Sequence, residues 1–202
     1  MEHQATSKVL ELLHMDLMES MQVKSIGGKR YVLVVVDDFS RFTWVNFIRE
    51  KSDTFDVFKD LSTQLQREKE CGTVRIRSDH GTEFENARFD EYCTSEGIKH
   101  EFSSPITPQQ NGVVERKNRT LQESSRGMLH AKHLPYRFWA EVMNTTCHIH
   151  NRITLRSGTS TTLYELWKGR KPTVKYLHVF GSKCYILSDR DYRRKMDPKS
   201  DE

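Results

Sequence analysis

The sequence of 202 residues contains no run of about 18 apolar residues, the minimum length of a membrane-spanning helix. Its longest apolar stretch, Tyr31 to Val36, has the length of one strand. The first four residues contain no apolar signal-peptide core, which argues against secretion. Internal repeats and low-complexity tracts are also absent. We therefore expect one globular domain, alone or with an appendage, that does not act in a membrane.

Cysteine is scarce, and its spacing excludes a disulfide-rich fold. The four cysteines are Cys71, Cys93, Cys147 and Cys184. They are widely separated and include no Cys-x-x-Cys pair. A small disulfide scaffold requires a denser framework, so the pattern predicts reduced thiols in an intracellular setting.

Charge is plentiful but unevenly distributed. Charged residues make up 30% of the chain, and the mean hydropathy is −0.72. The net charge of +4 is the sum of +5 on residues 166–202 and −1 on the other 165 residues. A nearly neutral body with a basic tail suits a polyanionic partner, because phosphate contacts supply the sequence-independent part of nucleic-acid affinity. A solvated linker would show the same distribution, so charge alone leaves both alternatives open.

Hydrophobic periodicity predicts the order of the elements. Residues 10–16, 31–36 and 42–48 have strand patterns, and Gly27-Gly28 marks a turn, so these segments predict an antiparallel meander. The following pattern predicts a helix from Ser52 or Asp53, a strand at 73–78, a helix at 87–95, a strand at 98–102, a helix at 112–129 and another after Pro135.

This order predicts an α/β fold with a mixed five-stranded sheet, in which an antiparallel meander is joined by parallel strands and helices cover both faces. Beyond Arg152 the composition shifts to Gly, Ser, Thr and basic residues. We predict a main domain at residues 8–152 and a basic C-terminal extension or linker at 153–202, with one further strand at Val179–Leu187.

Three carboxylates lie at positions that are typical of active-site residues. The pattern predicts that Asp16 ends the first strand, that Asp79 ends the fourth, and that Glu115 lies in the first turns of the long helix. If strands one and four are neighbours, the three carboxylates meet at one edge of the sheet. Hard divalent cations such as Mg²⁺ are coordinated by carboxylate oxygens, and two such ions about 3.5–4 Å apart can assist phosphoryl transfer. Exposed acids occur in every soluble chain, so this argument alone is only suggestive.

The local sequences make the hypothesis sharper. Asp79 lies in RSDHGTEF (residues 77–84), and Glu115 follows TPQQNGVV (107–114) and precedes RKNR, with 35 residues between the two acids. This spacing resembles the D,D-35-E signature of retroviral and retrotransposon integrases. The segments VDDFSR (36–41), FWAE (138–141), Asn151-Arg152 and VFG (179–181) resemble the copia-type branch specifically. The likeness extends from Leu10 to about Ser200.

The resemblance implies a ribonuclease H-like fold and a metal-dependent polynucleotidyl transferase that carries out 3′-end processing and strand transfer. By motif, Asp16 (in HMDL, residues 14–17), Asp79 and Glu115 would be the catalytic residues and would bind two Mg²⁺ or Mn²⁺ ions. Two departures from the family pattern touch no ligand: LMES follows where Gly-Pro is usual, and His80 stands where Asn is usual.

Further residues are predicted to contact DNA. In the resembled family the segment containing Gln110 and Asn111 belongs to an active-site loop, although a simple turn and helix start would also explain it. Helical spacing from Glu115 places Asn118, Arg119 and Gln122 on or near the same face, where they would hold phosphates. A solvent-exposed charged face is the alternative. Asp37 and Asp38 are interpreted as turn and hydrogen-bonding residues.

The resemblance also implies partners: double-stranded DNA as element ends and target, further copies of the chain in an active homo-oligomer, and flanking domains of a Pol polyprotein. It implies nuclear function, with a cytoplasmic stage during element assembly. One rival is a catalytically silent, transposon-derived DNA-binding or assembly module, because the family's upstream His-His-Cys-Cys zinc module is not in this sequence. A ribonuclease H proper is disfavoured by the 35-residue spacing and the PQQNG segment.

Overall fold

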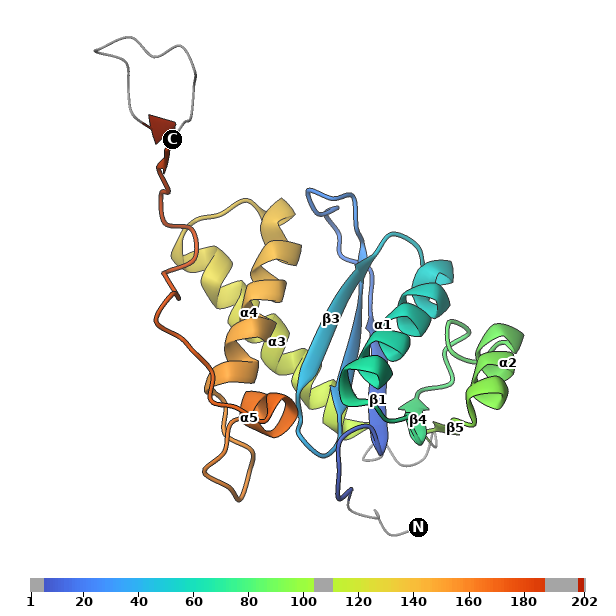
Figure 1. Ribbon diagram of the computed structural model, residues 1–202. Coiled ribbons are helices and arrows are strands. Elements are labelled where there is room, and N and C mark those ends of the chain that lie inside the picture. The colour runs from blue at the N-terminus through green and yellow to red at the C-terminus, as the bar shows by residue number, and fades with distance from the viewer. Residues whose placement is uncertain (1–5, 104–110, 188–199, 202) are drawn as a thin grey trace.

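The computed structural model describes residues 6–103, 111–187 and 200–201. It contains a five-stranded sheet of order β3-β2-β1-β4-β5 with helices on both faces (Figure 1). The sheet strands are β1 (Leu12–Met18), β2 (Tyr31–Asp37), β3 (Thr43–Ile48), β4 (Arg75–Ser78) and β5 (Lys99–Phe102). The α-helices are α1 (Thr54–Lys69), α2 (Ala87–Glu96), α3 (Gly112–Ala131), α4 (Trp139–Ile153) and α5 (Leu163–Lys168). Short 3₁₀ helices, η1 (Lys51–Asp53) and η3 (Tyr136–Phe138), precede α1 and α4, and β6 (Ile186–Leu187) pairs with β7 (Ser200–Asp201).

The sheet has the predicted mixed topology. β1, β2 and β3 pair antiparallel as a meander, while β4 pairs parallel to β1 and β5 parallel to β4. The first and fourth strands are therefore neighbours, which is the condition under which their carboxylates meet at one edge of the sheet. The parallel strands are joined through helices, because a parallel connection requires a crossover.

The central strands divide their side chains between two cores. In β2, residues 32–36 are all fully buried, as expected of a strand with both faces covered. Because side chains alternate across a strand, Leu33 and Val35 join the core under α1, α2 and α5, whereas Val32, Val34 and Val36 join the core under α3 and α4.

The core under α1 and α2 is rich in aromatic residues. Phe58 of α1 and Phe89 of α2 are fully buried, with ring centroids 5.5 Å apart. Complete burial of such a side chain stabilises the fold by about 1.5–3 kcal/mol. Both helices present apolar residues at spacings of three and four, which is why the sequence pattern predicted them.

α5 was not predicted, and it packs on the same aromatic core. Thr162 and Glu165 form a capping box at its start, and Gly169 ends it in the left-handed conformation. Trp167, only 1% exposed, lies edge-on to Trp44 with ring centroids 4.7 Å apart. Part of the predicted C-terminal extension is therefore packed on the sheet domain, while the boundary at residues 152 and 153 stays a prediction.

Two details differ from the sequence-based predictions. Asp16 does not end the first strand, because β1 continues for two more residues to Met18. The strand predicted at Val179–Leu187 is wrong for Val179 to Tyr185, and only Ile186 and Leu187 form a strand. In the described part of the chain, no helix is long and apolar enough to cross a membrane.

Candidate active site

The sheet register brings Asp16 and Asp79 together. In the parallel pair, His14 of β1 is opposite Arg77 of β4. Asp16 lies two residues further along β1, on the face of the sheet that α3 covers, and Asp79 directly follows the last residue of β4, so the register brings the two residues to the same edge of the sheet. This explains how carboxylates 63 positions apart in the sequence become neighbours at one edge of the sheet.

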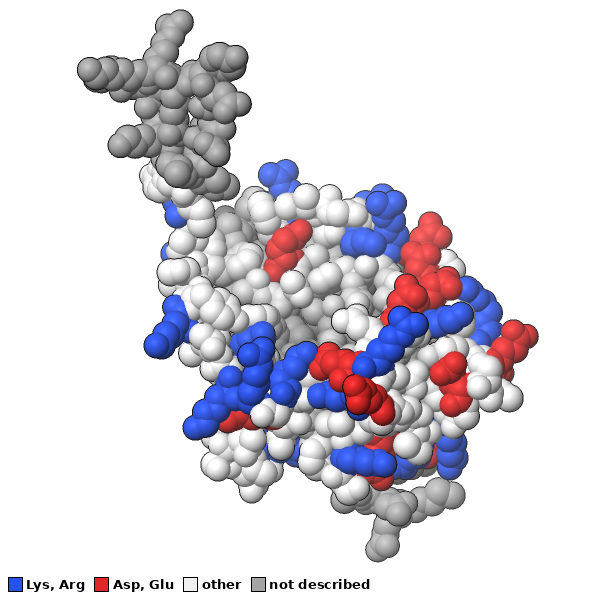
Figure 2. Space-filling view, in the orientation of Figure 1, with Lys and Arg blue, Asp and Glu red and all other residues white. Residues whose placement is uncertain are grey.

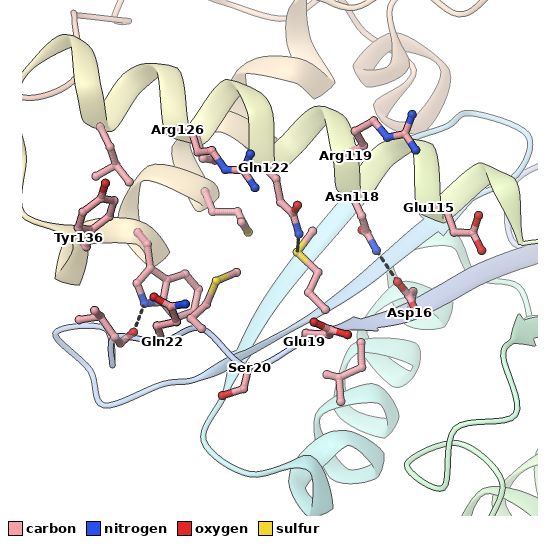
Figure 3. A pocket seen from close by; sticks show the side chains of 18 of the residues that line it. Asp16, Glu19, Ser20, Gln22, Glu115, Asn118, Arg119, Gln122, Arg126 and Tyr136 are labelled. Atoms are coloured by element: carbon pink, nitrogen blue, oxygen red, sulfur yellow. Dashed lines mark hydrogen bonds between the residues drawn. The ribbon is translucent and has the colours of Figure 1, made fainter.

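Glu115 reaches the same place from α3. It lies in the first turn of that helix, where the positive end of the helix dipole favours a carboxylate. All three carboxylates line one cavity of about 910 Å³, which we call the carboxylate cavity. The cavity runs between α3 and the β1–β2 connection, with Asp16 and Glu115 at one end and Tyr136 at the other (Figure 3).

The cavity concentrates negative charge around Asp16. Burial raises the pKa of Asp16 to about 6, and the charges of Asp79 and Glu115 contribute to this rise. Glu83, whose side chain is 9% exposed and pairs with Lys51, makes a smaller contribution in the same direction. Across the described residues, no Lys, Arg or His forms an ion pair with any of the three carboxylates.

The chemistry of this donor set fits a hard divalent cation, which prefers carboxylate oxygens. A bound cation would neutralise part of this negative charge and would lower the raised pKa of Asp16. However, in the described part of the chain no three His, Cys, Asp or Glu side chains are gathered closely enough to hold one metal ion. Asp79 Oδ1 accepts a hydrogen bond from Gly81 N at 3.1 Å, and Asn118 Nδ2 donates to Asp16 Oδ2.

The predicted face of α3 lines the cavity. Asn118, Arg119 and Gln122 all border it, as their helical spacing from Glu115 indicated (Figure 3). Asn118 is only 7% exposed, whereas Arg119 is exposed. This face therefore presents hydrogen-bond donors directly beside the carboxylates.

The structure places only one of the other two predicted DNA contacts. Gln110 lies outside the described residues. Asn111 is the N-cap residue of α3, is 2% exposed, and does not line the carboxylate cavity. Its Oδ1 has no hydrogen-bond partner among the described residues. A role for either residue in DNA binding stays a prediction.

Sequence reasoning missed the far end of the cavity. Arg126 and Tyr136 line it, together with the β1–β2 connection from Glu19 to Val23 (Figure 3). Trp139 Nε1 donates to Val23 O at 2.9 Å and so holds this connection against the start of α4. Arg126 was detectable, because it lies four residues after Gln122 on the same helical face. The hairpin residues carried no such signal.

Asp37 and Asp38 have the structural role that was predicted. Asp37 accepts hydrogen bonds from Leu10 N at 2.8 Å and from Ser40 N and Oγ at 2.8 and 2.6 Å. Asp38 pairs with His14 Nε2 at 2.9 Å and with Arg41 at 3.0 Å. Neither lines the carboxylate cavity. They instead fix the turn between β2 and β3.

Comparison with known proteins identifies related sequences. Residues 6–108 match the family model described as Integrase core domain. The retrovirus-related Pol polyprotein from transposon TNT 1-94 of Nicotiana tabacum is 36% identical over 95% of this chain and 14% of the relative. The corresponding polyprotein from transposon RE2 of Arabidopsis thaliana is 32% identical over 96% of this chain and 13% of the relative. The chain thus spans only about one seventh of these curated relatives.

Solved structures share the fold. The HTLV-2 integrase catalytic core domain in complex with magnesium (trimeric form) has a TM-score of 0.61 and 22% identity, covering 79% of this chain and 97% of that one. A simian T-cell lymphotropic virus intasome in complex with PP2A regulatory subunit B56 gamma has a TM-score of 0.67 and 17% identity, covering 93% and 63%. The fold is therefore the ribonuclease H-like fold of retroviral integrase cores, as predicted.

Proposed function

The chain belongs to the integrase core domain family, with relatives among plant copia-type transposons, and on this premise we propose that it catalyses metal-dependent polynucleotidyl transfer on DNA. One observation carries the proposal: carboxylates from β1, from the end of β4 and from α3 line a single cavity. We assign Asp16, Asp79 and Glu115 as its catalytic residues.

The same three residues would hold Mg²⁺ or Mn²⁺, two ions in the full site. Bound there, the cations would neutralise the carboxylates and act as Lewis acids toward a phosphodiester. Magnesium in the HTLV-2 core, a protein of the same fold, supports this choice of metal. Asn118 is a positioning residue in this scheme, since its amide holds one oxygen of Asp16.

The remaining groups of the cavity suit the DNA backbone. Arg119, Gln122 and Arg126 offer donors along one side of α3, and such contacts fix the register of a duplex without reading its sequence. In strand transfer, a DNA 3′-hydroxyl forms a new bond to a target phosphorus as the old phosphorus–oxygen bond breaks. The departing strand keeps that oxygen as a hydroxyl. In 3′-end processing, water takes the place of the attacking hydroxyl.

The partners follow from the same proposal. Double-stranded DNA, as element ends and target, would occupy the cavity, and the active complex would contain several copies of the chain. The trimeric HTLV-2 core and the simian virus intasome support assembly of this kind. Since the chain matches a small part of Pol polyproteins, we propose other Pol domains as its neighbours, with nuclear function after cytoplasmic assembly.

The test is strand joining, or its reversal on a branched DNA, with Mn²⁺ present. We expect weak activity from the 202-residue chain and none from Asp79→Asn. Asp60→Asn, at an exposed carboxylate on α1, is the matched control and should stay active. A folded chain that binds metal and DNA but joins no strands would support the rival reading, a catalytically silent DNA-binding module.

A further inference from the structure

A second cavity lies next to α3 and shares no lining residue with the carboxylate cavity. It has a volume of about 220 Å³, is open to solvent, and is bordered by the first half of α3, the turn between β2 and β3, and the connection between α4 and α5. Four cationic residues line it: Arg41, Arg116, Lys117 and Arg156. We call it the basic cavity.

The described residues that line the basic cavity include no Asp or Glu. The polar ones that are not cations are the hydroxyl residues Thr120, Thr154 and Ser157, and the others are apolar. Every polar side chain on its wall can therefore donate a hydrogen bond, and none is an obligate anion. The carboxylate cavity, in contrast, is lined by acidic residues as well as by Arg119 and Arg126.

The local fold fixes two of the four cations. Arg41 has a positive φ of 58° in the turn that Asp37 organises, and its guanidinium pairs with Asp38 at 3.0 Å. Arg156 Nε donates to Phe39 O at 3.0 Å, which ties the α4–α5 connection to the same turn. Both side chains are thus held in place by groups outside the cavity.

The other two cations come from α3. Arg116 folds back along the helix start, so that a Cβ placed on Gly112 would lie 2.9 Å from its Nη1. Lys117 is half-buried, and no carboxylate pairs with it among the described residues. Figure 2 shows Lys and Arg side chains gathered over the part of the surface where α5 lies.

Gathering these charges is unfavourable without a counter-charge. Like charges that share a site repel, and of the four cations only Arg41 pairs with a carboxylate, that of Asp38, among the described residues. The mutual effect is visible at Arg41, whose pKa is lowered by burial and further by the nearby charges of Arg156 and Arg116, against the opposing pull of Asp38. A tetrahedral oxyanion has enough acceptor oxygens to receive hydrogen bonds from several of the three guanidinium groups and the one ammonium group that line the cavity.

We propose that the basic cavity is a phosphate-binding site. Its volume corresponds to about seven water molecules, which is enough for one phosphate group with part of its hydration. The phosphate would be either a free anion or a group of a DNA backbone. The second source rests on the proposed function, whereas the binding of phosphate itself does not.

The first experiment compares inorganic phosphate with chloride at equal ionic strength. Phosphate should raise the Tm of the chain by about 2–5 °C, because a ligand that binds only the folded state stabilises it. Arg156→Gln and Lys117→Gln should remove the rise, and Arg156→Lys should keep part of it. Lys59→Gln, at an exposed lysine on α1, and Arg126→Gln, in the carboxylate cavity, should leave it intact.

A second measurement uses the unaltered chain, so its result does not depend on whether a variant folds. Phosphate should protect Lys117 of the unaltered chain from acylation, read by mass spectrometry, and Lys59 should react equally in phosphate and chloride. Equal Tm and equal labelling of Lys117 in the two salts would overturn the proposal. So would loss of the Tm rise in Arg126→Gln but not in Arg156→Gln, since phosphate would then bind in the carboxylate cavity.

The second experiment identifies the source of the phosphate. For a short duplex, the slope of log Kobs against log salt should fall by about 1 in Arg156→Gln if the cavity takes a backbone phosphate. Arg156→Gln combined with Arg126→Gln should lower it by about 2. An unchanged slope together with a lost phosphate response would identify a free anion as the ligand. Neither result depends on strand-joining activity.

Discussion

The two cavities beside α3 differ in size and in sign of charge. The carboxylate cavity is about 910 Å³ and is lined by Glu19 and the three proposed catalytic acids, none of which has an ion-pair partner in the described chain, whereas the basic cavity is about 220 Å³ and is lined by four cations. Glu115 and Lys117 are only two residues apart, but two helical steps of 100° place them on nearly opposite sides of the helix.

This difference shows that the net charge of the chain does not indicate the local charge of either cavity. A formal charge of +4 conceals an acidic and a basic site that are both lined by residues of α3. Acids gathered in a partly buried site are suited to cations, and cations gathered in another are suited to phosphates. One helix would thereby hold metal on one side and an anion on the other.

The largest effect should come from removing the anchor of α5. Trp167 is 1% exposed, and its Nε1 donates to Glu68 at 2.8 Å, so Trp167→Ala should cost about 3–5 kcal/mol of unfolding free energy in urea. Since Leu163 of α5 lines the basic cavity, the phosphate response should also disappear while the response to divalent cations persists. A loss below about 0.5 kcal/mol, the range of a surface substitution, would mean that α5 is not anchored there.

The two cavities should differ in how a substitution affects the rate of strand transfer, and Glu115→Gln tests the carboxylate cavity. We expect strand transfer to fall by more than about 100-fold, because loss of an outer partner of a metal ligand alone costs about 10–100-fold. Lys117→Gln should weaken DNA binding but keep the rate at saturating DNA. A rate for Glu115→Gln equal to that of the unaltered chain would remove Glu115 from the catalytic set.

Asp16→Asn should change how stability depends on pH. The pKa of Asp16 is raised to about 6, so the folded state holds its proton more tightly than the unfolded state does. The stabilisation is present at acid pH and is lost as the pH rises from about 4 to about 6. At pH 8 without divalent cations, Asp16→Asn should be more stable by about 2 kcal/mol.

At pH 4 the two proteins should be nearly equal in urea unfolding. Asp60→Asn on α1 is the control and should follow the unaltered chain at both values of pH. A stability gap between Asp16→Asn and the unaltered chain that is the same at pH 4 and pH 8 would contradict the electrostatic origin of the raised pKa.

The smallest effect should be the thermal response to metal. Millimolar Mg²⁺ or Mn²⁺ should raise the Tm by about 2–4 °C, and Asp16→Asn with Glu115→Gln should remove this rise. Arg156→Gln should keep it, since its charge lies in the other cavity. A rise that survives in the double variant would show that the cation binds elsewhere.

Much of the carboxylate cavity could be predicted because its signals are local. The segment around Asp79, the turn before Glu115 and the 35 residues between the acids are readable along the chain, and helical spacing extends them to Asn118, Arg119 and Gln122. The order of the five sheet strands along the chain could also be predicted, since each strand has its own apolar pattern. The end of β1 was placed too early, because Leu17 and Met18 continue the strand beyond the charged Asp16.

The sequence alone therefore predicted the order of the elements from β1 to α4, the fold class and, through the resemblance to integrases, the three acids, since periodicity and motif spacing are properties of neighbouring residues. Only the tertiary structure decided that Asp16 and Asp79 lie level, which depends on the register of β1 with β4. It also decided that α5 docks beside Trp44 and that Arg41, Lys117 and Arg156 share one cavity. These contacts join residues far apart in the sequence through packing, and no local pattern encodes such distances.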